Sequence, residues 1–136
     1  MNTAQQSPAE LVREYARHTI GSESFYRHSD FSSIVYTDGI KFVAEQCDAH
    51  WLIDAVDSWQ QRAHRAQRKL GLRDFQVWRL SFLEASEVWA LECWTDTPGE
   101  SERVVAQSIC FSDFPRDLAP FEFWVEDGVM MLKEER

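Results

Sequence analysis

The sequence of 136 residues lacks the features that mark secreted and membrane-spanning proteins. Its three cysteines form no CxxC pair, and no apolar run is long enough to cross a bilayer. The opening segment MNTAQQSPAE has neither the basic nor the apolar region of a signal peptide. We therefore expect a cytoplasmic protein that does not contact membranes and whose cysteines stay reduced.

Motifs of catalysis and cofactor binding are missing too. The five glycines occur singly, with no glycine-rich loop before a helix that could hold a phosphate. There is no GxSxG nucleophile elbow and no HExxH zinc-binding helix. These absences favour a protein that is not an enzyme, with no catalytic residue, no metal and no cofactor.

Basic residues are scarce in one part of the chain. Residues 1–83 have ten acidic and ten basic side chains, whereas residues 84–136 have thirteen acidic and four basic ones. The net charge of −9 therefore belongs to the last 53 residues. A field of this sign repels nucleic acids and anionic membranes, and it attracts a basic protein surface. Solubility alone is the other explanation of this charge.

One basic cluster stands out against this background. It lies near the end of a predicted helix and consists of Arg62, Arg65, Arg68, Lys69 and Arg73. Such a cluster can contact phosphates, but pairing with acidic neighbours is the simpler interpretation in a chain of this charge. A homodimer that joins this helix end to the acidic part of another copy is a further alternative.

The N-terminal part predicts a helix over residues 7–20. Ser7 is a favourable N-cap, Pro8 suits the first helical position, and Glu10 completes a capping box with Ser7. Gly21 is expected to end this helix in a left-handed conformation. The following segment, residues 22–32, has no period and is expected to be a loop.

A helical hairpin is predicted over residues 37–70. Thr37 or Asp38 can cap its first helix, and Asp48 can cap its second. In the second helix, apolar residues recur at three- and four-residue steps, and Gly71 follows at the C-terminal cap position.

From residue 74 onward the pattern changes to that of an antiparallel sheet, residues 74–133. Apolar and polar residues alternate, and Asp127-Gly128 between two apolar runs is typical of a tight hairpin. The expected strands are residues 33–36, 75–83, 87–95, 103–111 and the hairpin 121–132. We predict one α+β domain, residues 1–136, with the N-terminal helices packed on one face of a mostly antiparallel meander of about five strands.

Two sets of polar residues are candidate sites. The first set could bind a partner through carboxylates in loops and at strand ends, and it consists of Asp96, Glu100, Glu102, Asp113, Asp117 and Glu122. The second set is an alternative site for a ligand or a metal-dependent enzyme, and it consists of Tyr36, Asp38, Glu45, His50 and Asp54. His50 and Asp54 share a helix face. Helix caps and solvated helix faces are the simpler interpretation of this second set.

The segment VYTDGIKFVAEQCDAHWLIDAVDSWQ resembles an uncharacterised family of small bacterial proteins that plasmids and phages also carry. FQVWRL (75–80), FSDFP (111–115) and FWVEDGVMML (123–132) continue the resemblance, which extends from about Tyr26 onward. The N-terminal helix and the long loop TDTPGESE depart from the pattern, so that the helix looks like an addition. The resemblance implies a compact domain from mobile elements, and it brings no activity, cofactor or site residue.

Size, charge and this setting together favour a non-enzymatic binding protein. We expect an inhibitor, such as an anti-CRISPR or a similar counter-defence protein, that occupies a basic surface of a host nucleic-acid-binding protein. Carboxylates on a rigid scaffold can take the place of phosphates there. The second set of polar residues supports the alternative, a small ligand-binding or metal-dependent enzyme domain.

Overall fold

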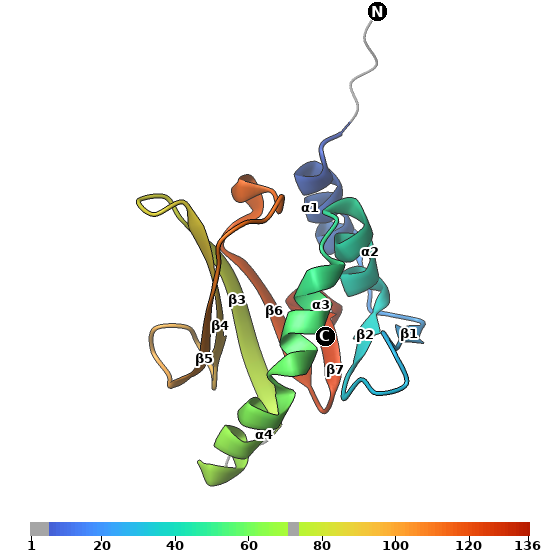
Figure 1. Cartoon of the computed structure of the whole chain (residues 1–136). Coiled ribbons are helices and arrows are strands. Elements are labelled where there is room, and N and C mark those ends of the chain that lie inside the picture. Colours follow the sequence, from blue (N-terminus) through green and yellow to red (C-terminus); the bar gives the residue numbers. More distant parts are fainter. Residues whose placement is uncertain (1–5, 71–73) are drawn as a thin grey trace, which may run out of the picture.

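The computed structural model describes residues 6–70 and 74–136, which are built around one seven-stranded sheet (Figure 1). The strand order is β1-β2-β7-β6-β3-β4-β5. The strands are β1 Phe25–Tyr26, β2 Val35–Thr37, β3 Phe75–Leu83, β4 Val88–Trp94, β5 Arg103–Ile109, β6 Phe121–Glu126 and β7 Val129–Leu132. Neighbouring strands are antiparallel except β2 and β7, which are parallel.

Four α-helices are found in the described part of the chain. They are α1 Pro8–His18, α2 Asp38–Gln46, α3 His50–Ser58 and α4 Gln60–Lys69, and two 3-10 turns are η1 Arg116–Leu118 and η2 Lys133–Glu135. In Figure 1, α2, α3 and α4 follow one another along one side of the sheet, and α1 lies beside α2. The predicted α+β class is therefore confirmed. None of these helices is long and apolar enough to span a bilayer.

Alternating burial separates the two faces of the sheet. In β4, Trp89, Leu91 and Cys93 are buried, whereas the residues between them are only partly buried. The same alternation holds in β6, where Phe121 and Phe123 are buried. Side chains of successive strand residues point to opposite faces, so the buried set packs under the helices and the other face of the sheet stays open.

The sheet has more strands than the sequence pattern indicated. Residues 22–32, expected to be a loop, contain β1, which pairs Tyr26 with Tyr36 of β2. The β2 strand then runs parallel to β7, with Val35 opposite Val129. Neither strand is long enough to show an alternating pattern, and their pairing joins segments far apart in the chain.

The predicted long second helix is interrupted at Trp59. The α3 helix closes with a hydrogen bond from Trp59 N to Val56 O (3.3 Å), and α4 begins one residue later. The Trp59 indole donates to Gln107 on β5 (2.7 Å), which places this residue outside the regular helix repeat. After this interruption Ala63 is buried, whereas Leu70, in the same predicted stripe, follows the last residue of α4 and is 45% exposed.

Helix ends test the capping predictions. The Ser7–Glu10 capping box is present, but α1 ends at Thr19 in an extended conformation rather than at Gly21. The N-cap of α2 is Thr37. Asp48 caps nothing: it has a φ of 50°, and Ala49 precedes α3 without a side-chain cap. The predicted cap Gly71 lies outside the described residues.

The predicted hairpin at Asp127-Gly128 is confirmed. Both residues have positive φ, 51° and 80°, as a two-residue hairpin turn with the twist of the flanking strands requires. The turn joins β6 to β7, with Glu126 opposite Val129.

Buried amides attach α4 to the sheet in place of apolar contacts. Gln60 and Gln76 are 1% and 0% exposed, and their side chains exchange two hydrogen bonds of 3.0 and 2.9 Å. Gln76 also accepts from the Trp78 indole (2.8 Å), and Gln67 donates to the carbonyl of Phe75 (2.7 Å). Because such groups are costly to bury unpaired, these pairs determine where α4 sits.

A buried carboxylate connects the C-terminus to the start of α2. Glu135 accepts hydrogen bonds from the Thr37 hydroxyl (2.6 Å), Gly39 N (3.0 Å) and Leu132 N (2.9 Å). The first residues of a helix have unpaired N–H groups and favour negative charge. A Cβ atom on Gly39 would lie 2.5 Å from Oε1 of Glu135, so the carboxylate fits only against glycine.

We predict that Gly39→Ala lowers the free energy of unfolding by roughly 1–3 kcal/mol, the usual cost of overpacking. Glu135→Ala is also destabilising, because it leaves the N–H groups of Gly39 and Leu132 buried and unpaired. In the Gly39→Ala/Glu135→Ala double variant the clash is absent. The double variant should therefore lose less unfolding free energy than the sum of the losses in the two single variants. Urea unfolding of the four proteins measures this coupling, and strictly additive losses would contradict the contact.

Candidate functional site

Asp38 of the alternative site has a structural role. Its carboxylate accepts hydrogen bonds from the Tyr26 hydroxyl (2.8 Å), Glu23 N (3.0 Å) and Ser24 N (3.4 Å). The Tyr26 hydroxyl, followed by the backbone N–H of Glu23, lowers the pKa of Asp38, and the same contact raises the pKa of Tyr26. Asp38 therefore joins residues 22–26 to α2 and is occupied by its own chain.

Three other residues of the alternative set gather around a residue that sequence reasoning missed, His28. Its Nε2 lies 3.0 Å from Oδ1 of Asp54, and its ring centroid is 6.4 Å from the rings of both His50 and Tyr36. Asp54 is 65% exposed, so this polar cluster lies at the surface. No spacing in the sequence relates His28 to α3, and Glu45 is exposed on α2.

The described residues contain no group of three or more histidine, cysteine, aspartate or glutamate side chains that could hold a metal ion. A histidine paired with a carboxylate can act as a general base when a nucleophile stands beside it. The neighbouring rings of Tyr36 and His50 are tilted and centred more than 6 Å away. In the polar cluster of Tyr36, His50, Asp54 and His28, the contacts of His28 are therefore with one carboxylate and two neighbouring rings.

Five of the six candidate carboxylates of the partner site are divided between the two ends of the sheet, and the sixth lies on its open face. Asp96, Glu100 and Glu102 lie in the loop 95–102 between β4 and β5, at the lower end of the sheet in Figure 1. Asp113 and Asp117 lie in the connection 110–120 at the upper end, near α1. Glu122 lies on the open face of β6, opposite Arg79.

Ion pairs distinguish these carboxylates further. Asp117 lies 3.3 Å from Arg13 of α1, and Glu122 lies 3.6 Å from Lys133. In the described part of the chain, the three carboxylates of the loop 95–102 have no such cationic partner. Asp113 also makes no ion pair within the described residues, so four of the six candidate carboxylates are uncompensated and three of these four lie together in this loop.

The backbone of the loop 95–102 is held by its own hydrogen bonds. Thr95 N donates to Glu102 O (3.0 Å), and Glu102 N donates to the Thr95 hydroxyl (3.2 Å). Asp96 N donates to the Ser101 hydroxyl (3.0 Å), which in turn donates to Thr97 O (2.9 Å). Such a loop presents its carboxylates from a defined backbone, which lowers the entropy lost when it binds.

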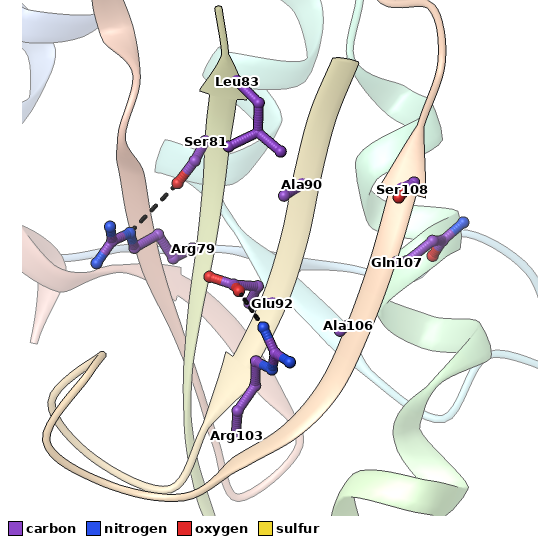
Figure 2. A pocket seen from close by; sticks show the side chains of 9 residues that line it. All are labelled: Arg79, Ser81, Leu83, Ala90, Glu92, Arg103, Ala106, Gln107 and Ser108. Atoms are coloured by element: carbon purple, nitrogen blue, oxygen red, sulfur yellow. Dashed lines mark hydrogen bonds and ion pairs between the residues drawn. The ribbon is translucent and has the colours of Figure 1, made fainter. Parts of the chain in front are cut away.

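A shallow hollow of about 430 Å³ lies on the open face above β3, β4 and β5 (Figure 2). Small side chains form its centre, including Ala90, Ala106 and Ser108. Arg79 and Arg103 stand around it in Figure 2, and Arg103 is paired with Glu92 (2.9 Å).

Arg79 is the central charge of the open face. It lies opposite Glu92 on β4 and Glu122 on β6 in the strand register. Its Nε donates to the Ser81 hydroxyl (3.3 Å), and it makes no ion pair within the described residues. Its two acidic neighbours are themselves paired with Arg103 and Lys133, so charges of alternating sign cross the sheet and keep this face polar.

The cysteines have no catalytic setting. Cys47 and Cys93 are buried, and burial raises the pKa of Cys47 to about 11 and shifts that of Cys93 further upward. The thiolate is the reactive form, so these two thiols are inert at neutral pH. Cys110 is exposed at the end of β5.

The comparisons with known proteins place the chain in a family context. A family model described as a family of unknown function (DUF6876) matches residues 10–136. The match begins inside α1, so the interpretation of the N-terminal helix as an addition is wrong. The curated proteins and the solved structures returned no match.

We predict that only one thiol reacts with a disulfide reagent in the native protein at pH 8, because only Cys110 is exposed. Cys110→Ser should abolish the rapid reaction, and Cys47→Ser should leave its rate unchanged. Unfolding in denaturant should release all three thiols. Rapid labelling of Cys47 or Cys93 in the folded protein would contradict their burial.

Tyr26→Phe should raise the pKa of the Asp38 carboxyl toward its ordinary value of 3.8. Because the folded-state pKa of Asp38 is lowered, its contribution to stability is complete above the unfolded-state value and is lost as the pH falls through the folded-state value. Because the folded-state pKa of Tyr26 is raised, the contribution of Tyr26 to stability is lost as the pH rises through that folded-state value. The stability difference between the two proteins should be largest at roughly pH 5–9, and ¹³C NMR of the carboxyl should show the shift.

Proposed function

The chain belongs to DUF6876, and we propose that this member is a non-enzymatic binding protein that engages a basic surface of a partner protein. One observation carries this proposal. The loop 95–102 is held by its own backbone and side-chain hydrogen bonds, and its three carboxylates have no cationic partner in the described part of the chain.

The distribution of ion pairs supports this loop over Asp117 and Glu122. Asp117 and Glu122 are already compensated by Arg13 and Lys133, so a partner would have to displace those contacts. The carboxylates of the loop need only lose water. Complementary charges of this kind accelerate the encounter and orient the partners, and the net charge of −9 adds a long-range attraction for a basic surface that salt screens.

The partner that we propose is a protein with a nucleic-acid-binding groove. Such grooves carry arginine and lysine side chains arranged for phosphates, and carboxylates on a fixed loop can occupy them. A protein that acts in this way competes with the nucleic acid for the groove and thereby inhibits the partner protein. The resemblance to proteins of plasmids and phages makes a counter-defence inhibitor, of the anti-CRISPR kind, the specific form of this proposal.

A second candidate function rests on the polar cluster around His28. The imidazole contact with Asp54 and the nearby rings of Tyr36 and His50 favour binding of a small polar ligand. This surface lies on β2, α3 and the segment before β2, away from the loop 95–102 in Figure 1. The two proposals can therefore be separated by variants that affect one surface only.

We predict that Glu100→Lys/Glu102→Lys abolishes capture of the partner from a lysate of the native host, because like charges then face each other. The partner of the wild-type protein should also be lost in a high-salt wash. Both loop residues are exposed, so the thermal unfolding temperature should stay close to that of the wild type.

The matched control makes the same change of charge at the other end of the sheet. Glu84→Lys/Glu87→Lys should retain the partner, since both residues are exposed in the turn that joins β3 to β4 at the upper end of the sheet. Equal loss with both pairs would show a non-specific effect of net charge and reject the loop as the site. Loss with His28→Ala but not with the loop variant would reject the loop and assign the contact with the partner to the surface around His28.

A further inference from the structure

β5 is one of the two edge strands of the sheet, and the other is the two-residue strand β1. It pairs with β4 on one side, and no strand of the described chain pairs with its other side. In an antiparallel strand the backbone groups of alternate residues point to opposite edges. The Arg62 side chain donates to Val104 O (3.1 Å), so the backbone of Val104 points away from β4. By the same alternation, the N–H and C=O groups of Ala106 and Ser108 point outward.

A groove runs between this edge and the helix layer. It is a cavity of about 260 Å³ lined by Trp59, Arg62, Arg103, Val104, Val105 and Ala106. The hydrogen bond from the Trp59 indole to Gln107 fixes one wall of the groove. Ala106 and Ser108 are both exposed, and they also border the hollow on the open face shown in Figure 2. A helix beside a free strand edge is the arrangement in which an extended peptide adds as a further strand.

The charges beside β5 select the chemistry of such a peptide. Side chains of an added strand alternate between the two faces of the sheet. Arg62 stands on the helix side of the edge, and Arg103 stands on the open face. One carboxylate of an added strand could therefore meet Arg62, and the next one, on the opposite face, could share Arg103 with Glu92, which lies 2.9 Å from it.

The rest of α4 adds to this positive field. Arg65, Arg68 and Lys69 are exposed and make no ion pair within the described residues. The hydrogen bond from Arg62 already occupies the carbonyl of Val104, so strand pairing would begin at Ala106. The carboxylates of the loop 95–102 come before Arg103 in the chain, outside the paired part.

We propose that the outer edge of β5 is a strand-addition site for an extended acidic segment of a partner protein. A second copy of the chain fits this edge less well, because residues 103–109, RVVAQSI, include no carboxylate that could meet Arg62 or Arg103. The site is separate from the loop 95–102 and has the opposite charge, so it does not depend on the function proposed above.

The test uses the full chain, labelled with ¹⁵N, and an acetylated peptide of two Thr-Glu-Glu-Thr repeats as the probe, because adjacent glutamates of a strand point to opposite faces. The peptide should bind and slow hydrogen exchange of the Ala106 and Ser108 amides by roughly tenfold or more, because these groups would become hydrogen-bonded. The same peptide with lysine in place of every glutamate should not bind. Sedimentation of the free protein across a range of concentrations tests for a second copy at the same edge.

Ala106→Pro is the decisive variant. Proline lacks the outward N–H but leaves the hydrogen bonds of the neighbouring residues to β4 in place. Affinity for the acidic peptide should fall by roughly tenfold or more, whereas Ala106→Val, which keeps the N–H, should bind like the wild type. A peptide methylated on every backbone nitrogen provides the same test without changing the protein, and it should not bind.

Several results would overturn the proposal. Failure of the acidic peptide to bind rejects the site, and equal binding of the lysine peptide rejects the role of charge. Binding that leaves the two amides unprotected, or that survives methylation of the peptide, rejects strand addition. A dimer of the free protein that protects Ala106 and Ser108 would identify a second copy as the occupant instead.

Discussion

The contact between Glu135 and the start of α2 is the constraint on which the arrangement of the chain depends. The carboxylate satisfies backbone N–H groups of Gly39 and Leu132, so it connects the last turn of the chain to a helix that begins nearly a hundred residues earlier. This contact holds β7 beside β2, and the parallel pair in turn provides an edge for β1. Thr37 and Gly39 both donate hydrogen bonds to this carboxylate. Asp38, between them, joins the segment 22–26 to the same helix.

A second constraint decides what stands beside β5. The α4 helix buries little apolar surface, and the amide pair of Gln60 and Gln76 attaches it to the sheet. Buried amides need partners in specific directions, so they determine the place of α4 more narrowly than apolar contacts would. This arrangement sets Arg62 against the edge of the sheet, where its guanidinium group meets a backbone carbonyl of β5.

Charges of opposite sign consequently adjoin each other in space. The loop 95–102 carries uncompensated carboxylates, and the strand that follows it is flanked by Arg62 and Arg103. Across the open face, acidic and basic side chains alternate and largely neutralise each other. The excess negative charge of the chain is therefore expressed mainly at loops, while the free edge of the sheet stays positive. Two surfaces with different charge preferences can coexist on a protein whose net charge is −9.

The sequence by itself determined the elements whose signals are local. The Ser7–Glu10 capping box, the Asp127-Gly128 turn and the alternation within β3 and β4 each depend on residues close together in the chain. The placement of the acidic loops at opposite ends of the sheet could also be predicted from the sequence, because successive loops of an antiparallel meander lie at opposite ends. Only the tertiary structure decided the pairing of β2 with β7, the break at Trp59, the place of His28 beside Asp54 and the burial of Glu135. Each of these depends on contacts between distant segments, which leave no periodic signal and are set by packing and by the need to pair buried polar groups.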